Sequence, residues 1–251
     1  MIKQNIWIIN QYGSLVNTGI GRHRYLSKEL ANLGYKVSLI SARWSHVSKD
    51  EELLAPELEK FEDFQFLRIP VIKYKHAHDK KRILNWFYFA FKLLGISHKL
   101  NEKPDVIIYS SPSLIGYLSA YRLAKKYHAK LFFEVRDIWP LTPIQMGGYS
   151  PKHPFIRFLQ WIEDFAYRKS DQVISLFPYA VEHMVEHGMT RDKFIWIPNG
   201  IHPTELKNAE PLNKSVEVAL PKDKFIVGYT GTFGLANNLS SLIEAAKILK
   251  E

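Results

Sequence analysis

The feature that most constrains the fold is a strand, a glycine-bearing turn, a helix and a second strand, all within the first forty-odd residues. Residues 5–10 form a short, mostly apolar run that is typical of a strand buried on both faces. After a polar loop, a helical pattern begins at Tyr25 and ends at Gly34, and residues 37–40 read as the next strand. This order is one βαβ unit, so we expect an α/β protein with a Rossmann-like parallel sheet and helices on both faces.

The turn after the first strand carries Gly19 and Gly21, followed directly by Arg22 and His23. Ligands of open α/β sheets bind at the carboxyl ends of the strands, and the N–H groups at a helix start suit an anion. The dinucleotide fingerprint is absent because no third glycine follows Gly21 at the required spacing. A cationic helix start therefore favours an anionic or sugar-bearing ligand. The alternative is that the two glycines only permit a turn.

Composition narrows the possible partners. The chain has 251 residues, is 46% apolar, lacks cysteine and has a net charge of +9. An apolar content of this size suffices for a packed core, and the absence of cysteine fits a reducing cytoplasm. The positive charge favours a phosphorylated substrate, an anionic membrane surface or nucleic acid, or else serves only solubility. Nucleic acid is disfavoured because the basic residues show no recognition-helix spacing and no nucleic-acid-binding motif occurs.

Further strands and helices alternate along the chain and give three predicted parts. We expect a Rossmann-like domain over residues 1–203, a polar linker over 204–222, and the first strand and helix of an incomplete second domain over 223–251. Within the first domain, residues 49–61 read as an acidic helical stretch. Within the last part, residues 225–229 read as a strand.

A basic loop over residues 73–82 leads directly into an aromatic-rich run over residues 83–94. The run is too short to span a bilayer, which needs about twenty apolar residues. Basic residues followed by such a helix indicate an interfacial membrane contact; the alternative is a core helix behind a solvated loop. The candidate contact residues are Lys80, Lys81, Arg82, Trp86 and Phe87.

A second candidate site lies at the end of the predicted strand over residues 131–135, where Arg136 and Asp137 follow directly. Unpaired charges are costly in a core, so this pair is expected at the mouth of the strand. Ser111 lies in the turn after the preceding strand and belongs to the same edge. The alternative is that Arg136 and Asp137 form a structural ion pair with each other or with neighbours.

With these residues in place, the chain resembles bacterial family 4 glycosyltransferases, which have two facing Rossmann-like domains, the GT-B architecture. It is most similar to the O-antigen and capsule enzymes of the L-fucosamine transferase type. The resemblance covers nearly the whole chain. It rests on the order of four segments: the Gly19–Gly21 loop, residues 134–140, residues 197–201 and residues 229–238.

The resemblance implies a retaining hexosyltransferase that takes a sugar from a nucleotide donor, with UDP as the expected nucleotide. The acceptor would be a lipid-diphosphate-linked sugar or a polysaccharide in lipopolysaccharide or capsule synthesis, handled by a cytoplasmic enzyme peripheral to the inner membrane face. The acceptor-site candidates are Gly19, Gly21, Arg22, His23, Ser111, Arg136 and Asp137. The interdomain and donor-side candidates are Asn199, Gly200, Gly231, Thr232, Phe233 and Gly234.

No cofactor and no metal are expected, because no Asp-x-Asp occurs with which to hold a divalent cation against the donor diphosphate. Two features depart from the family. Residues 231–238 lack the arginine and lysine that often meet the diphosphate, and the family's Glu-x7-Glu element is missing. The catalytic residues are therefore left unassigned, and the chain alone is expected to be an inactive fragment. A sugar-nucleotide epimerase of the same fold and a non-catalytic binding half with a partner chain remain alternatives.

Overall fold

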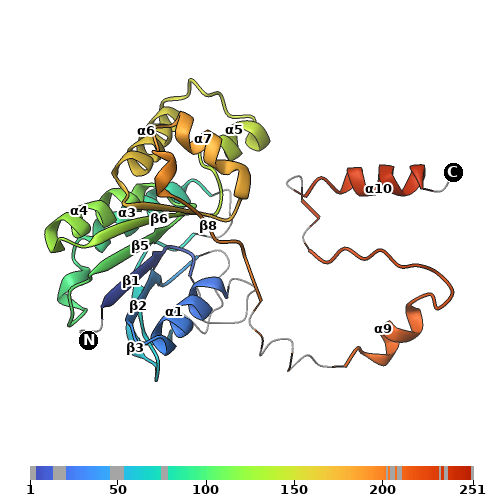
Figure 1. Cartoon of the computed structure of the whole chain (residues 1–251), viewed down its shortest axis with the longest axis horizontal. Coiled ribbons are helices and arrows are strands. Elements are labelled where there is room, and N and C mark those ends of the chain that lie inside the picture. Colours follow the sequence, from blue (N-terminus) through green and yellow to red (C-terminus); the bar gives the residue numbers. More distant parts are fainter. Residues whose placement is uncertain are drawn as a thin grey trace.

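A computed structural model of the chain describes residues 4–13, 21–45, 54–74, 79–201, 203, 207, 211–231, 233–234 and 237–249. Its centre is an eight-stranded sheet with the strand order β3-β4-β2-β1-β5-β6-β7-β8 (Figure 1). Every neighbouring pair runs parallel except β3 and β4. The strands are β1 (Asn5–Asn10), β2 (Lys36–Ala42), β3 (Leu58–Lys60), β4 (Gln65–Ile69), β5 (Val106–Ser110), β6 (Lys130–Val135), β7 (Gln172–Ser175) and β8 (Phe194–Trp196).

The central strand β1 determines where a ligand can bind. It lies between β2 and β5, and all six of its residues are buried, as its apolar sequence predicts. The chain moves from β1 to one side of the sheet for β2 and β4, and returns to the other side for β5 to β8. The strand order thus reverses beside β1, and a crevice outside the carboxyl ends of the strands is the usual ligand site at such a point.

Alternate residues of β1 supply two cores on opposite faces of the sheet. Trp7 and Ile9 belong to the larger core, which is covered by three long helices, and Ile6 and Ile8 belong to the smaller one, which packs against Leu26 and Leu30 of α1 (Arg22–Asn32). The long helices are α3 (Lys81–Leu93), α4 (Ile115–Tyr127) and α6 (Pro154–Lys169). The prediction of helices on both faces is therefore confirmed (Figure 1).

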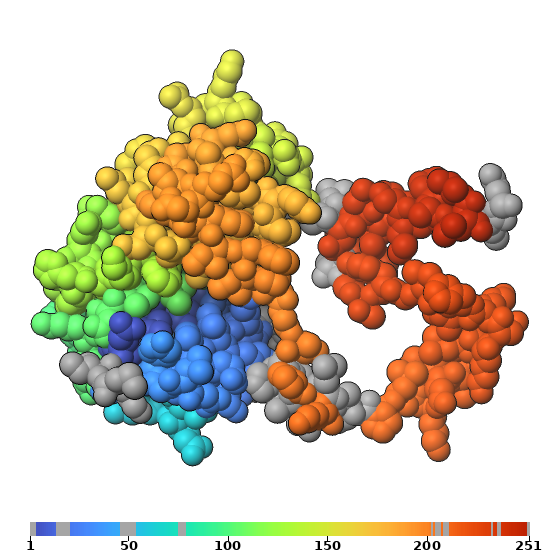
Figure 2. Space-filling model, in the orientation of Figure 1, coloured from blue at the N-terminus to red at the C-terminus, as the bar shows by residue number. Residues whose placement is uncertain are grey.

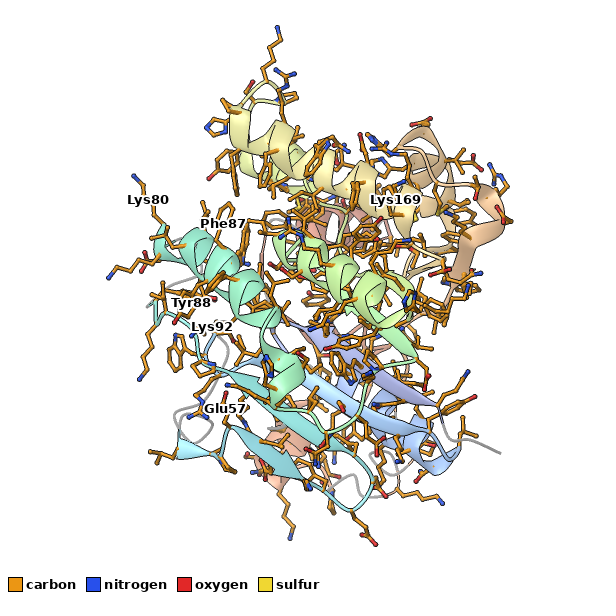
Figure 3. The ribbon with its side chains drawn as sticks, turned by 90° about the vertical axis from the view of Figure 1, so that its left-hand side faces the viewer. Glu57, Lys80, Phe87, Tyr88, Lys92 and Lys169 are labelled. Carbon is orange, nitrogen blue, oxygen red and sulfur yellow. The ribbon has the colours of Figure 1, made fainter. Side chains whose placement is uncertain are left out.

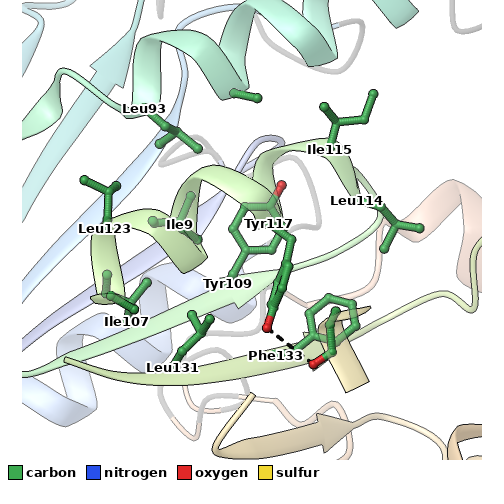
Figure 4. Close-up of a cluster of buried hydrophobic side chains, with 14 of the residues drawn as sticks. Ile9, Leu93, Ile107, Tyr109, Leu114, Ile115, Tyr117, Leu123, Leu131 and Phe133 are labelled. Carbon is green, nitrogen blue, oxygen red and sulfur yellow. Dashed lines mark hydrogen bonds between the residues drawn. The ribbon is translucent and has the colours of Figure 1, made fainter. Parts of the chain in front are cut away.

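Aromatic side chains fill the larger core beneath α4 (Figure 4). Tyr117 meets Tyr109 and Phe133 edge to face, with ring centroids 5.9 and 5.2 Å apart. The buried hydroxyl groups are satisfied: Tyr117 Oη lies 2.8 Å from Ser170 Oγ, and Tyr109 donates to the carbonyl of Ser113. These contacts fix α4 against β5 and β6, whose carboxyl ends carry candidate site residues.

Short elements connect the main ones. They are η1 (Ile96–His98), α5 (Leu141–Gly147), η2 (Pro178–Ala180), α7 (Val181–Glu186), η3 (Arg191–Lys193), α9 (Lys214–Ala219) and α10 (Leu239–Ile248). One expectation is corrected among the elements. The helical stretch over residues 49–61 is wrong for its last part, where β3 pairs antiparallel with β4. The linker over 204–222 contains the short helix α9, capped by the Asn213 side chain.

The C-terminal part, residues 211–249, lies away from the sheet domain, and nearly all of its described residues are exposed (Figures 1 and 2). The strand expected over residues 225–229 does not form, although α10 does. The apolar residues of the segment 225–229 are exposed, including Phe225 and Val227. A strand needs a neighbour to accept its backbone hydrogen bonds, and among the described residues none lies beside this segment.

Candidate functional site

Three polar side chains lie next to one another where neighbouring parallel strands end. Asn10 of β1 pairs in register with Ser110 of β5, which pairs with Glu134 of β6. All three are buried, although each is a polar residue at or near the end of a mostly apolar strand. We call this edge of the sheet, with the loops that follow β1, β5 and β6, the rim.

Glu134 is the charged centre of the rim. Its Oε1 atom lies 2.9 Å from Arg22 Nε and its Oε2 atom 2.8 Å from His23 Nε2, and that ring nitrogen also lies 3.0 Å from Ser110 Oγ. Burial alone raises the pKa of Glu134, but the hydrogen bond and charge of His23, together with Ser110 and Arg22, outweigh it and hold the pKa well below its ordinary value. Glu134 is therefore an ionised structural anchor for the start of α1.

Arg22 connects the rim to the chain that leaves the sheet after β8. While its Nε donates to Glu134, Nη1 donates to the carbonyl of Pro198 at 2.7 Å and Nη2 to that of Ile197 at 3.1 Å. The guanidinium is thus occupied by the protein itself. The place of Arg22 in an acceptor site stays a prediction, and a phosphate bound there would have to replace some of these contacts. Asn199 and Gly200, predicted at the interdomain boundary, follow directly and are exposed.

Ser111 positions the turn that holds Arg136 and Asp137. Its hydroxyl oxygen accepts hydrogen bonds from the backbone N–H groups of Arg136 at 2.9 Å and Asp137 at 3.4 Å, and its carbonyl accepts one from Asn10 Nδ2 at 3.1 Å. No ion pair joins Arg136 to Asp137 or to another of the residues that the structure describes. Among the described residues, the structural ion pair that the sequence left open is therefore not formed.

Several buried polar atoms at this end of the sheet make no hydrogen bond with any described residue. They are Gln11 Oε1, His23 Nδ1, Arg43 Nε and Arg136 Nε. Unsatisfied buried polar atoms are rare in folded proteins, and a bound polar ligand is one way to satisfy them. Gln11 and Arg43 follow β1 and β2, so they belong to the same edge as the predicted residues.

The predicted glycines have different outcomes. Gly19 and Thr232 lie outside the described residues. Gly21 precedes α1 with φ −71°, a conformation open to any residue, so the turn itself does not require glycine. A Cβ atom there would instead lie 2.8 Å from Cε2 of the Tyr25 ring, so the small residue allows the ring to pack. Gly231, Phe233 and Gly234 are described, but no hydrogen bond or ion pair between described residues joins them to the rim.

The aromatic run and the last two residues of the basic loop form α3, which has one buried and one exposed face (Figure 3). Trp86 is buried and its Nε1 donates to the Tyr12 hydroxyl at 2.6 Å, so its prediction as a membrane contact is wrong. Arg82 is half-buried and packs over the rings of Tyr12 and Trp86. Lys80, Lys81 and Phe87 are exposed as the prediction requires.

The exposed face of α3 also carries apolar residues that the sequence did not single out. They include Leu84 and Phe91, which are 59% and 69% exposed. None of the helices in the described part of the chain combines the length and the apolar character needed to cross a bilayer.

Sequence reasoning missed Glu134 and Ser110 as members of the site. A signal for Glu134 was present, because a carboxylate in an apolar strand needs a partner and Arg22 and His23 had none nearby in the sequence. Ser110 gave no such signal.

Comparison with known proteins places the chain among sugar transferases. The sequence model of Glycosyltransferase Family 4 matches residues 18–205. No curated protein shows a significant sequence match.

Solved structures with the same fold include sucrose-phosphate synthase (tll1590) from Thermosynechococcus elongatus, with a TM-score of 0.69 and 15% identity over 97% of this chain and 59% of that one. Anabaena Alr3699/HepE in complex with UDP and glucose has a TM-score of 0.56 and 13% identity over 97% of this chain and 57% of that one. Arabidopsis thaliana UGT89C1 complexed with UDP-L-rhamnose has a TM-score of 0.55 and 13% identity over 89% and 56%.

At these identities the likeness establishes the fold, which is that of GT-B glycosyltransferases. The chain spans less than two thirds of the length of each of these three structures.

Proposed function

The chain belongs to glycosyltransferase family 4, and we propose that it is the acceptor-side part of an enzyme that transfers a sugar with retention from a nucleotide donor to a lipid-diphosphate-linked acceptor. The observation that carries the proposal is the rim. There, the buried Glu134 holds Arg22 and His23 at the start of α1. Arg136 is half-buried and has no ion-pair partner among the described residues, so its guanidinium is available to a ligand.

Arg136 is the residue that we assign to the acceptor diphosphate. Its Nε is buried without a hydrogen-bond partner among described groups, and its backbone is held by Ser111. A guanidinium binds a phosphate through charge-assisted, often bidentate, hydrogen bonds. Asp137 is exposed next to it and would orient an acceptor hydroxyl, while the donor's own phosphate takes the hydroxyl proton.

The donor is proposed to be a UDP-sugar. Alr3699/HepE and UGT89C1 are complexed with UDP or a UDP-sugar, and both share the fold of this chain. The donor is assigned to a second domain, which would begin within the C-terminal part of the chain. We propose that transfer needs no metal, in keeping with the absence of Asp-x-Asp from the sequence. The leaving diphosphate would then be stabilised by helix N-termini and basic side chains.

The acceptor lipid would bring the enzyme to an anionic membrane surface at the cytoplasmic face, through the exposed side of α3. Lys80 and Lys81 lie at its start and Phe87 and Phe91 along its outer face, which places cationic and apolar groups on one surface. An amphipathic helix of this kind lies in the interface without crossing it. A role in lipopolysaccharide or capsule synthesis, and the closer likeness to L-fucosamine transferases, stay predictions.

The test is kinetic and uses the longest natural polypeptide that contains this chain, assayed with UDP-sugars and a polyprenyl-diphosphate-sugar acceptor. Arg136→Lys keeps the positive charge but removes the planar guanidinium that can bind a phosphate through two hydrogen bonds. The KM for the acceptor should therefore rise about tenfold, while the free energy of unfolding stays unchanged. Asp137→Asn should lower kcat. Arg157→Lys, on the exposed side of α6, is the matched control.

Normal rates in both rim variants would overturn the assignment. A loss of activity explained by unfolding alone would do the same, since the pair would then be structural.

A further inference from the structure

Helices α6 and α7 bring together four side chains that ligate metals, away from the rim. Glu163 and Asp164 lie on α6, and His183 lies on α7, with His187 at its C-cap. The two histidines are four residues apart, so they project from the same side of their helix, and their ring centroids are 4.4 Å apart. In the sequence the two histidines are spaced His-x3-His, and this spacing was the signal for the cluster.

The ligand atoms of Glu163, Asp164 and His187 are close enough for one ion, and His183 lies next to Glu163. His187 Nδ1 lies 2.9 Å from Asp164 Oδ1, and His183 Nε2 lies 3.6 Å from Glu163 Oε1. One ligand atom from each of Glu163, Asp164 and His187 falls within 4.8 Å of the others. Three of the side chains are partly open to solvent, at 20–29% exposed, whereas that of Glu163 is 1% exposed.

The buried carboxylate of Glu163 lacks a permanent positive partner. It accepts hydrogen bonds from the Tyr167 hydroxyl at 2.9 Å and from Gln160 Nε2 at 2.7 Å, both neutral groups. Its ion-pair partner among the described residues is His183, whose Nε2 is itself buried without a hydrogen bond. A buried carboxylate without a cation is costly, so a bound cation would stabilise this arrangement.

The hydrogen-bond network beside it also fails to close. Gln160 Nε2 lies 2.7, 2.8 and 2.9 Å from Glu163, Asp164 and His187 Nδ1, but it carries only two hydrogens. If His187 Nδ1 donates to Asp164, its contact with Gln160 joins two donors. If it accepts from Gln160, its contact with Asp164 joins two acceptors. A cation bound by Nδ1 and Oδ1 removes the conflict, because both lone pairs then point at the ion.

We propose that Glu163, Asp164 and His187 form a structural site for a divalent transition-metal ion, with His183 beside Glu163 and with Zn²⁺ as the reference ion. An imidazole with two carboxylates suits Zn²⁺, whereas Ca²⁺ and Mg²⁺ prefer all-oxygen sites. The site lies on α6 and α7, away from the rim, so the ion takes no part in transfer. It braces α6 against α7, the helix that leads into β8 and the segment held by Arg22.

The experiment is calorimetric titration of ZnCl₂ into chelator-treated chain, followed by Co²⁺ absorption as a report on coordination by nitrogen and oxygen. Wild type should bind one equivalent. Asp164→Asn and His187→Asn should each weaken Zn²⁺ binding at least about tenfold. These positions are partly exposed, so the variants should remain folded by circular dichroism, unlike Glu163→Gln. His98→Asn, at an exposed histidine, should bind as wild type does.

Absence of a saturable one-equivalent site would overturn the proposal. So would unchanged binding in both ligand variants, or an equal loss in His98→Asn. Binding of Mg²⁺ or Ca²⁺ as tight as that of Zn²⁺ would overturn the assignment to a transition metal.

Discussion

Arg22 forms an ion pair with the buried Glu134, with Nε and Oε1 2.9 Å apart, although the two residues lie 112 positions apart in the sequence. The pair joins the first residue of α1 to the end of β6 and therefore connects two loops of the rim. A contact between such distant residues fixes the relative position of loops that local sequence does not.

We expect Glu134→Gln to destabilise the chain by about 1.5–3 kcal/mol, because the substitution removes the negative charge that accepts from Arg22 and His23. Urea unfolding of the purified chain measures the change. Glu182→Gln is the control, since its pair with Arg191 is exposed and should not contribute measurably. Equal urea midpoints for wild type and Glu134→Gln would show that the pair does not stabilise the fold.

The stability of the chain should fall on the acid side of the ordinary carboxyl range. The pKa of Glu134 is lower in the folded state than its ordinary value of 4.5, so the unfolded state binds more protons there. The stabilisation is fully present above that ordinary value and is lost as pH falls below it. Urea titrations from about pH 6 to about pH 3 should show wild type and Glu134→Gln converging. A constant difference over this range would contradict the prediction.

Gly116→Ala should destabilise the chain by about 1–3 kcal/mol through overpacking. A Cβ atom at this position would overlap the hydroxyl of Tyr109, which is fully buried and held by the Ser113 carbonyl. Gly95→Ala is the matched control, because its Cβ would meet its nearest neighbour at an ordinary 3.7 Å. Thermal unfolding compares the two variants. Similar melting temperatures would mean that Tyr109 can move aside.

Replacing Lys80 and Lys81 by Ser should weaken binding to anionic vesicles about 25-fold, since each basic residue near such a surface contributes about 1 kcal/mol. Phe87→Ser should weaken it further by removing an exposed apolar contact. The matched control, Lys28→Ser with Lys60→Ser, removes the same charge from α1 and β3. Cosedimentation with phosphatidylglycerol vesicles measures the effect. An equal loss in the control would show that net charge alone, and not α3, determines binding.

The chain by itself should show no transferase activity and little affinity for UDP or UDP-sugars. In the described C-terminal part, Gly231 and Phe233 of the predicted donor side are exposed, and no described strand lies behind them to build a pocket. Calorimetry with UDP is the direct measurement. Tight, saturable binding would mean that the rim domain itself holds the nucleotide.

The sequence predicted the sheet domain because its strands are apolar runs separated by helical periods, a pattern that local composition carries. It did not predict the fate of residues 225–229, which have the composition of a strand but no neighbouring strand with which to pair. It also misplaced the last part of residues 49–61, where pairing of β3 with β4 overrides a helical composition.

The rim was predicted only in outline. Parallel strands place their following loops at one edge, so Arg22, His23, Ser111 and Arg136 could be assigned to it from spacing alone. Which charge pairs with which depends on contacts over more than a hundred residues, as between Arg22 and Glu134. The same limit applies to Trp86, where an aromatic pattern indicates an amphipathic helix but not which rings turn inward.

The hydrogen bonds of Arg22 to the carbonyls of Ile197 and Pro198 fix the position at which the chain leaves the sheet domain. Asn199, Gly200 and Ile201, which follow directly, are exposed, so the chain can bend there without disturbing the sheet. The same guanidinium that neutralises Glu134 therefore also binds the backbone carbonyls at which the chain leaves the sheet domain. A movement of the following residues that displaces these carbonyls would act on Arg22 and, through it, on the rim.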